Sequence, residues 1–464
     1  MKIFSTALFC GVFLGLAAEA QTTFPSDYKP TCPVGATMLD GWFATGAASA
    51  GGKVDPADSV AFPPIENTKC DFYRWGAQMF LWLTSPDNGG VVLDSAQFLD
   101  VVETSSGFAF EDNSGAAANT FALRTRKEDS IGGTGQAGGG GVLLSQAGSL
   151  AYYGIHTNDI YAQFLTGNKA GAFNGTDLET NFPISQADMD LIAKYVGAPL
   201  DDAEAMTMEL KTAWVDASTV DAGQFITILA EVPSFDRSSD TEWPVTGTET
   251  ITLALVGLHI AAPVQGHKEM VWSSFEHISV SPAQAYYYLN ASGQTAEQAF
   301  SGAGEWIFFP TGGAAPAAVT EAASFDSSKN AIVAKGGETI RPVSVVQQNP
   351  WGLAPADTSA AQDNTDLVSL NATLLGMLQG LGDVRGNYLQ LGGIWTAEGQ
   401  IPDGDQDPAL RGGLRLANAT METFHQLTTA EPNQTRSCFT CHNTGGGDSG
   451  LGLSHIFDSL APLP

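Results

Sequence analysis

A five-residue segment near the C-terminus, Cys438-Phe439-Thr440-Cys441-His442, combines two thiols and an imidazole at fixed spacing. Its form, C-x-x-C-H, is the pattern that attaches a c-type haem: the cysteines form thioethers with the vinyl groups, and the histidine is the proximal iron ligand. A zinc site would need a second pair of ligands, and the chain has no second paired-cysteine motif. A redox dithiol of the thioredoxin type is followed by a helix, whereas a Gly-rich stretch follows this motif.

The sequence leaves the second axial ligand of such an iron open. Only 22 residues follow His442 and none is methionine, so residues upstream of the motif and the short tail must enclose the ring. The two leading candidates are Met421, on the segment that enters the motif, and His455 in the tail. The alternatives are an open, water-bound iron or one of the other histidines, namely His156, His259, His267, His277 and His425. Arg436, just before the motif, is either the partner of a haem propionate or a plain exposed side chain.

The first 20 residues have the features of an export signal. Lys2 supplies the positive charge, residues 3–17 are apolar but too short for a stable membrane span, and Ala18-Glu19-Ala20 is a cleavage site of the A-x-A type. We expect cleavage after Ala20 and a periplasmic or secreted mature protein. No later apolar run is long enough to cross a bilayer.

Cysteine usage agrees with export. Cys10 lies in the expected signal, and Cys438 and Cys441 belong to the haem motif, so Cys32 and Cys70 remain. An oxidising compartment allows this pair to form a disulfide, which we predict. The alternative is two buried free thiols.

The charge balance limits the classes of partner. Fifty acidic residues against twenty basic ones give a formal net charge of −30, which argues against nucleic acid and anionic membranes. The acidity favours solubility, a basic redox partner or a salty habitat. The expected partner is a redox protein or a small-molecule electron donor or acceptor. A hydrophobic content of 43% is ample for a packed core.

The pattern of residues predicts an α+β fold, with a central antiparallel sheet or sandwich flanked by helices and a C-terminal helical haem-binding segment. After the signal (1–20) we expect a loop-rich and helical region (21–200), a β-rich domain (201–350) and a helical haem region packed on the main body (351–464). Helices are expected at 70–83, 185–196, 366–381 and 407–425. Strands are expected at 210–215, 224–232, 249–259 and 270–280, with further ones at 306–309 and 340–346.

The stretch from His259 to His277 contains three histidines together with Lys268, Glu269, Trp272 and Glu276. A metal or substrate site could be built from it. The favoured interpretation is that His259 and His277 are satisfied core histidines on neighbouring strands.

Several segments resemble exported bacterial cytochrome c family proteins with a single C-terminal c-type haem. They are VGLHI (256–260), VWSSFEHI (271–278), LANATMETFHQ (416–426), SCFTCHN (437–443) and, near the N-terminus, FYRWGAQMFLWL. The resemblance implies haem c and a redox role, and it implies no substrate.

Three functions therefore remain. The first is electron transfer by an exported monohaem cytochrome. The second is a haem-dependent oxidoreductase, peroxidase- or oxygenase-like, with an open iron site. A dihaem peroxidase is excluded because a second C-x-x-C-H is missing. The third is a ligand-binding β-domain in which the haem is structural or sensory.

Overall fold

The computed structural model describes residues 24–62, 68–104, 107–112, 120–122, 141–314, 321–347, 358–404, 407–414, 416–423, 438–444 and 449–464. The expected export signal, His425 and Arg436 lie outside these residues.

Six α-helices lie in the described part of the chain: α1 (Ala36–Trp42), α2 (Lys69–Leu83), α3 (Asp159–Lys169), α4 (Gln186–Val196), α5 (Thr358–Leu381) and α6 (Cys438–Cys441). The helices expected at 70–83, 185–196 and 366–381 are confirmed as α2, α4 and α5. α2 begins where the backbone N–H of Thr68 donates to the carboxylate of Asp71 (3.1 Å). α4 begins where Ser185 Oγ accepts the N–H of Asp188 (3.3 Å).

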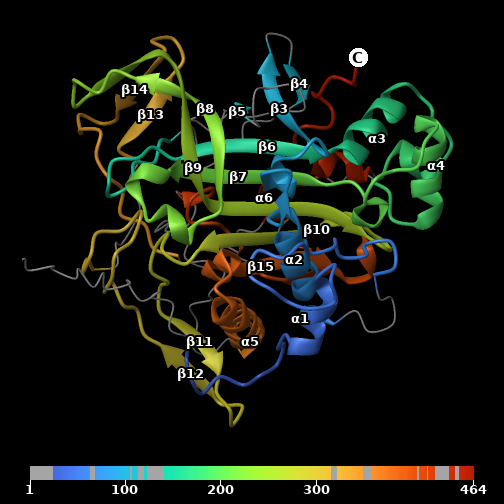
Figure 1. The fold of residues 1–464 in the computed structure, drawn as a ribbon, viewed down its shortest axis with the longest axis horizontal. Helices are drawn as coiled ribbons and strands as arrows, with labels where there is room; N and C mark the ends of the chain where they lie inside the picture. Colours follow the sequence, from blue (N-terminus) through green and yellow to red (C-terminus); the bar gives the residue numbers. More distant parts are fainter. Residues whose placement is uncertain are drawn as a thin grey trace, which may run out of the picture.

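A 12-stranded, mostly antiparallel sheet occupies the centre of the molecule (Figure 1). Eight strands form its main path in the order β16-β15-β10-β9-β7-β6-β3-β4, while β8 and β14 pair with β9, β13 pairs with β14, and β5 runs parallel to β8. The α+β fold is thereby confirmed. The bounds are β3 (Phe98–Thr104), β4 (Gly107–Asp112), β5 (Thr120–Ala122), β6 (Tyr152–Asn158), β7 (Glu209–Asp216), β8 (Thr227–Phe235), β9 (Glu242–Val264), β10 (His267–His277), β13 (Ala323–Asp326), β14 (Ala331–Ala334), β15 (Tyr388–Thr396) and β16 (Leu410–Gly412).

Two small hairpins complete the strands: β1 (Pro86–Asp87) with β2 (Gly90–Val91), and β11 (Tyr286–Leu289) with β12 (Thr295–Gln298). The four main expected strands correspond to β7, β8, β9 and β10. The strands expected at 306–309 and 340–346 are wrong, because both segments are irregular. Their buried backbone groups are satisfied by isolated bonds instead of a ladder, such as Phe308 N to Val280 O (3.0 Å) and Val345 N to Phe308 O (2.8 Å).

The C-terminal region differs most from expectation. The helix expected at 407–425 is wrong for the described residues, where β16 is followed by turns. Gly412 has φ +81°, and an added Cβ there would lie 2.3 Å from the Gly393 carbonyl oxygen, so β16 packs too closely for a helix. Strand β15, with all nine residues buried, lies inside the sheet. The sheet therefore takes strands from all three regions that the sequence suggested, and they share one structure.

Helix α2 covers one face of the sheet. Phe80 of α2 stacks on Phe275 of β10 (4.6 Å between ring centroids). Gly76 lies so close to Ser273 that an added Cβ would meet its hydroxyl. Because side chains alternate along a strand, the neighbours of Ser273 and Phe275 face the other way.

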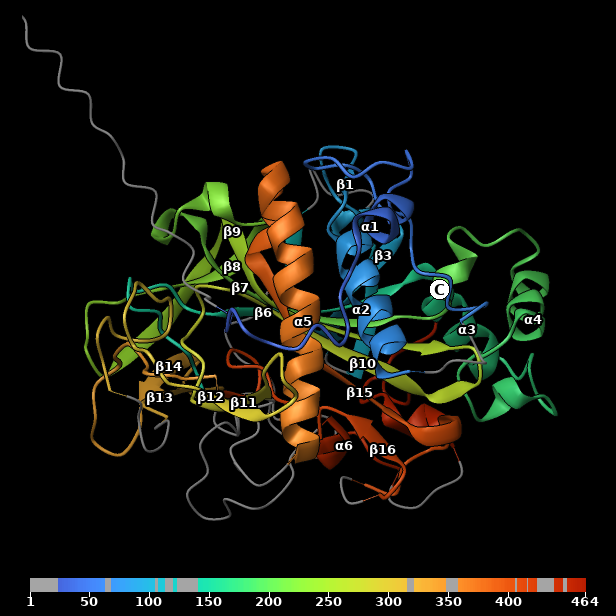
Figure 2. The ribbon, with the colours of Figure 1, turned by 90° about the horizontal axis from the view of Figure 1, so that it is seen from below.

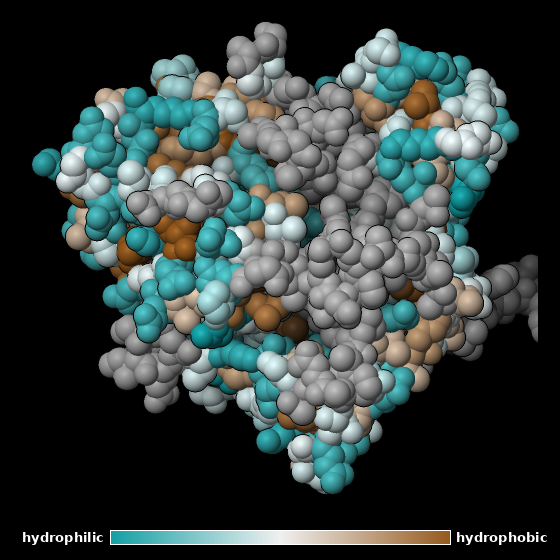
Figure 3. Space-filling view, turned by 180° about the vertical axis from the view of Figure 1, so that it is seen from behind, coloured by the Kyte–Doolittle hydropathy of each residue, from teal (hydrophilic) through white to brown (hydrophobic). Residues whose placement is uncertain are grey.

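The opposite face of the sheet is covered by the C-terminal part of the chain. Asn418 Nδ2 donates to Ser274 Oγ (3.3 Å), and the N–H of Ala419 donates to the carboxylate of Glu276. Figure 2 shows the same division, with α1 and α2 on one side of the sheet and α6 on the other. Figure 3 views the molecule from the α6 side, where the described surface is largely hydrophilic with apolar patches between.

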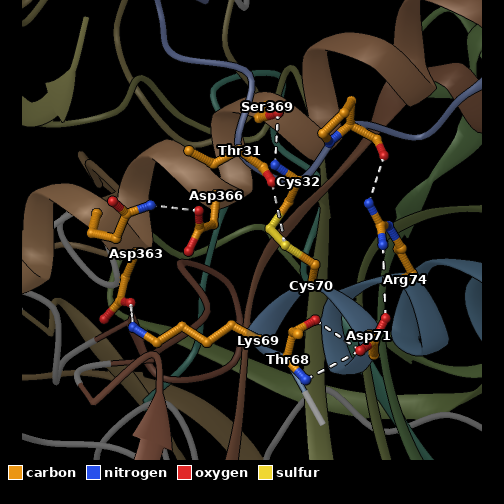
Figure 4. The surroundings of a disulfide bond; sticks show 12 residues. Thr31, Cys32, Thr68, Lys69, Cys70, Asp71, Arg74, Asp363, Asp366 and Ser369 are labelled. Carbon is orange, nitrogen blue, oxygen red and sulfur yellow. Dashed lines mark hydrogen bonds and ion pairs between the residues drawn. A yellow bond between two sulfur atoms is a disulfide. The ribbon is translucent and has the colours of Figure 1, made fainter. Parts of the chain in front are cut away.

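A disulfide joins Cys32 to Cys70, with the two Cα atoms 5.3 Å apart (Figure 4). It ties the N-terminal lead-in to the start of α2, as the sequence predicted. Cys32 also donates its N–H to Ser369 Oγ of α5 (3.1 Å), and Arg74 donates to the Pro33 carbonyl (2.9 Å).

None of the helices among the described residues is both long and apolar enough to cross a membrane.

Candidate functional site

The C-x-x-C-H residues occupy one helical turn. α6 spans Cys438–Cys441, and the N–H of His442 donates to the Cys438 carbonyl (2.8 Å), so the histidine continues the turn. Phe439, which is fully buried, anchors this turn edge-on to Trp272 of β10 (6.0 Å, 77°). The two cysteine side chains are partly buried and belong to the same turn.

The ring of His442 is oriented by two contacts. Its Nδ1 lies 2.8 Å from the Leu453 carbonyl oxygen, and since a carbonyl only accepts, Nδ1 carries the proton. Its ring also packs against Trp272 at 4.3 Å between centroids. With the proton on Nδ1, Nε2 keeps the lone pair that binds a metal, which is the tautomer that a haem ligand requires.

His455 lies beside His442. The two rings stack at 3.7 Å between centroids and 10° between planes, and His455 Nε2 lies 3.1 Å from the Cys441 carbonyl oxygen. A carbonyl can only accept, so this Nε2 also carries a proton. Two histidines that ligate one iron from opposite sides point their nitrogens at each other. The structure brings the two predicted residues together, but side by side instead of opposed.

Met421 packs in a different apolar cluster from the haem motif. It is fully buried in an apolar cluster with Ala419 and Phe308, whereas Phe439 and Cys438 pack with the main core. Its methyl group would lie 3.1 Å from a Cβ added at Gly257 of β9. Residues 424–437, which connect it to the motif and include His425 and Arg436, lie outside the described part.

A charged cluster lies on the α6 side of the sheet. Ser274, His259 and Lys211 are register partners on β10, β9 and β7, so His259 and Lys211 project side by side. Both reach Glu422: His259 Nε2 lies 3.0 Å and Lys211 Nζ 3.9 Å from its carboxylate oxygens. We call Lys211, His259 and Glu422 the carboxylate cluster.

The carboxylate cluster lies close enough to Cys438 to act on its thiol. Burial is the main reason that the pKa of Cys438 is raised, and the negative charge of Glu422 raises it further, while Lys211 opposes both. Burial and Glu422 therefore both favour the neutral thiol over the thiolate.

Two further acids hold the C-terminal chain to this face. Ser454 Oγ donates to Glu209 (2.6 Å) and also lies 2.9 Å from the hydroxyl of Tyr161. Burial raises the pKa of Glu209 to about 7. Burial likewise raises the pKa of Glu276 well above its usual value. The hydrogen bonds that its carboxylate accepts from backbone N–H groups lower the pKa, but by less.

The other three histidines in the described part of the chain each contact a partner of their own. His156 pairs with Asp100 (2.7 Å) and His267 with Glu269 (2.8 Å). His277 stacks on Phe225 at 3.7 Å, and burial lowers its pKa to about 3. The stretch from His259 to His277 therefore does not gather its histidines into one site. No group of three or more His, Cys, Asp or Glu side chains in the described ranges is placed to hold a metal ion.

Sequence reasoning missed the carboxylate cluster and the Leu453 carbonyl. The period-two pattern of Trp272, Ser274 and Glu276 was the available signal for a functional face, but only the register of β7, β9 and β10 shows which residues share it.

No protein-family model matches the chain, and no curated protein or solved structure matches it either.

Proposed function

We propose that this protein is an exported c-type cytochrome that carries one covalent haem and transfers single electrons. The observation that carries the proposal is the orientation of His442: it shares one helical turn with Cys438 and Cys441, and the Leu453 carbonyl fixes its proton on Nδ1. When bound, the haem would supply a one-electron iron couple.

The surroundings of the thiols favour a haem over the other uses of a C-x-x-C pair. A redox dithiol works as a thiolate, which needs a lowered thiol pKa. A zinc site needs further ligands, and the described residues form no group of three or more His, Cys, Asp or Glu side chains placed to hold a metal ion. At Cys438 the pKa is raised, mainly by burial. A thioether carries no charge, so it suits this apolar position.

The chain's own residues would hold such a haem as follows. Cys438 and Cys441 attach it, and His442 provides the proximal nitrogen. Trp272 packs on the His442 ring at 4.3 Å and excludes water from one side of it. The resemblance of the haem motif and its flanking segments to exported monohaem cytochromes supports the same assignment.

The rest of the proposal concerns location and partners. The Cys32–Cys70 disulfide is compatible with an oxidising compartment, which supports export. The net charge of −30 favours a basic redox protein or a small-molecule electron donor or acceptor as the partner. No contact with nucleic acid or span of a membrane is proposed.

A haem-dependent oxidoreductase is the second candidate, and the carboxylate cluster is the observation that favours it. His259 and Glu422 form an acid–base pair 3.0 Å apart on the sheet face near Cys438, and such a pair could move protons to or from a substrate.

The ferric and ferrous absorption spectra of the holoprotein, recorded with and without carbon monoxide, separate the two candidates. A low-spin spectrum that carbon monoxide leaves unchanged supports electron transfer. The sulfur-to-iron charge-transfer band, compared between wild type, Met421→Leu and His455→Gln, then identifies the second ligand. A high-spin ferric spectrum with ready carbon monoxide binding contradicts the electron-transfer proposal. The second candidate then predicts that His259→Gln alters the pH dependence of cyanide binding.

A further inference from the structure

A cavity of about 680 Å³ lies at the C-terminal end of β10. Its walls come from residues 145–147 before β6, the segment 219–225 between β7 and β8, the end of β10, residues 305–307, and the segment 379–387 at the end of α5 and after it. Its volume is typical of small-molecule sites. His277, which lines it, is five residues from Trp272, or roughly 16 Å along the strand, and faces the opposite side of the sheet. The cavity is therefore separate from the haem motif.

The cavity is electrostatically negative. Asp221 and Glu305 are exposed carboxylates in its wall, and none of the described residues that line it is lysine or arginine. The third carboxylate in the wall, Asp383, pairs with Arg385 (2.6 Å). His277 adds no positive charge, because burial lowers its pKa to about 3. An anionic ligand would find no counter-charge here.

Three amide side chains in the wall donate hydrogen bonds to backbone carbonyl groups. Gln146 Nε2 donates to the Val343 carbonyl (2.5 Å), Gln379 Nε2 to the Gly386 carbonyl (2.9 Å) and Asn387 Nδ2 to the Gln224 carbonyl (3.0 Å). The exposed carboxylates of Asp221 and Glu305 only accept hydrogen bonds, so they favour a ligand that carries N–H donors.

Aromatic rings complete the wall. Phe225 is held in place by its stacking on His277 at 3.7 Å. The indole Nε1 of Trp306 is buried and has no hydrogen-bond partner among the described residues. Aromatic faces attract cations and cover aliphatic chains. A bare metal ion fits poorly, because the described residues form no cluster of three metal-ligating side chains.

We propose that this cavity binds a small organic cation. Its ammonium or guanidinium group is held by the carboxylates of Asp221 and Glu305, and its carbon chain lies against Phe225 and Trp306. This inference is independent of the haem, and it gives the β-rich body a task besides enclosing the haem motif.

Isothermal titration calorimetry of the full-length mature protein with agmatine, putrescine, glucose and succinate tests the proposal. The test variant is Asp221→Asn with Glu305→Gln. Asp221 accepts the N–H of Gly223 at 3.3 Å, and the amide oxygen that replaces its carboxylate can accept the same hydrogen bond. The matched control, Asp190→Asn with Glu297→Gln, removes the same charge from exposed acids outside the cavity wall.

We expect agmatine or putrescine to bind wild type and the control alike, and the test variant to bind roughly tenfold more weakly. Glucose and succinate should not bind. Absence of binding by both amines would overturn the proposal, as would an equal loss in both double variants, which would mean a general effect of the negative charge. Succinate or glucose binding as tightly as the amines would also overturn it. Circular dichroism of each variant confirms that it is folded before titration.

Discussion

Removal of the Cys32–Cys70 disulfide should destabilise the protein by a calculable amount. The bond joins residues 38 apart, and its effect arises mainly because it restricts the unfolded chain. The chain-entropy relation for a loop of this length gives about 13 cal/mol/K, or about 4 kcal/mol at 25 °C.

The native contacts around the bond should survive its removal. The Lys69–Asp363 ion pair and the hydrogen bond from Arg74 to the Pro33 carbonyl also hold the lead-in and α2 in place. We therefore expect Cys32→Ala with Cys70→Ala to fold as wild type does, yet to unfold at lower urea concentration.

Equilibrium urea unfolding, followed by tryptophan fluorescence, measures the difference. The control is wild type in dithiothreitol, which should fall to the stability of the variant, since both then lack the same cross-link. A loss below about 1 kcal/mol, against the roughly 4 expected from loop closure, would show that the bond does not act through the unfolded chain. Thiol labelling of both cysteines in the protein purified from an oxidising compartment would show that the bond does not form.

Three further predictions concern buried groups. Trp272→Ala should lower the free energy of unfolding by about 3–5 kcal/mol, because it removes the ring that packs on His442 and Phe439. Trp272→Phe should lower it clearly less. Equal losses of the two variants in urea unfolding would contradict this. Because the pKa of Glu209 is about 7 in the folded state and the ordinary value is 4.5, the unfolded chain loses this proton first, so stability should fall by up to about 3 kcal/mol as pH rises from 4.5 to 7. Glu209→Gln should flatten that part of the pH profile, and an unchanged slope would count against the assignment. Arg385→Met should lower the free energy of unfolding by about 3–5 kcal/mol, since it leaves Asp383 buried without its partner at 2.6 Å. The double variant Asp383→Leu with Arg385→Met should recover most of this loss, which thermal melts would measure.

Local signals in the sequence were sufficient for the elements with strong patterns. α4 has a clear N-cap at Ser185 and ends at Gly197, whose φ of +77° suits glycine. Strands β7 to β10 are rich in β-branched and aromatic residues, which distinguishes them from helices.

Strand β15 lacked such a signal. It is buried on both faces, so its polarity does not alternate, and it contains Gly392 and Gly393, which weaken a strand pattern. The pairing with β10 explains Gly393, because an added Cβ there would lie 3.0 Å from the Trp272 carbonyl oxygen.

The candidate site likewise has one part that the sequence predicts and one part that only the fold reveals. The C-x-x-C-H motif is local and can be recognised from the sequence, whereas the partners of its histidine depend on the fold. His259 and Glu422 are 163 residues apart and meet because β9 and the turns after β16 lie on one face. Likewise, the stacking of His455 on His442 depends on the path of the tail and not on its composition.

Intact-mass spectrometry of the denatured protein decides whether a haem is covalently attached at the C-x-x-C-H motif. The protein is expressed with its export signal in a bacterium that makes c-type cytochromes, and wild type is compared with Cys438→Ala/Cys441→Ala. We predict that wild type keeps the added mass of one haem after denaturation and that the variant has none. A wild-type mass that matches the bare polypeptide, or a haem retained by the variant, would contradict the proposed cytochrome.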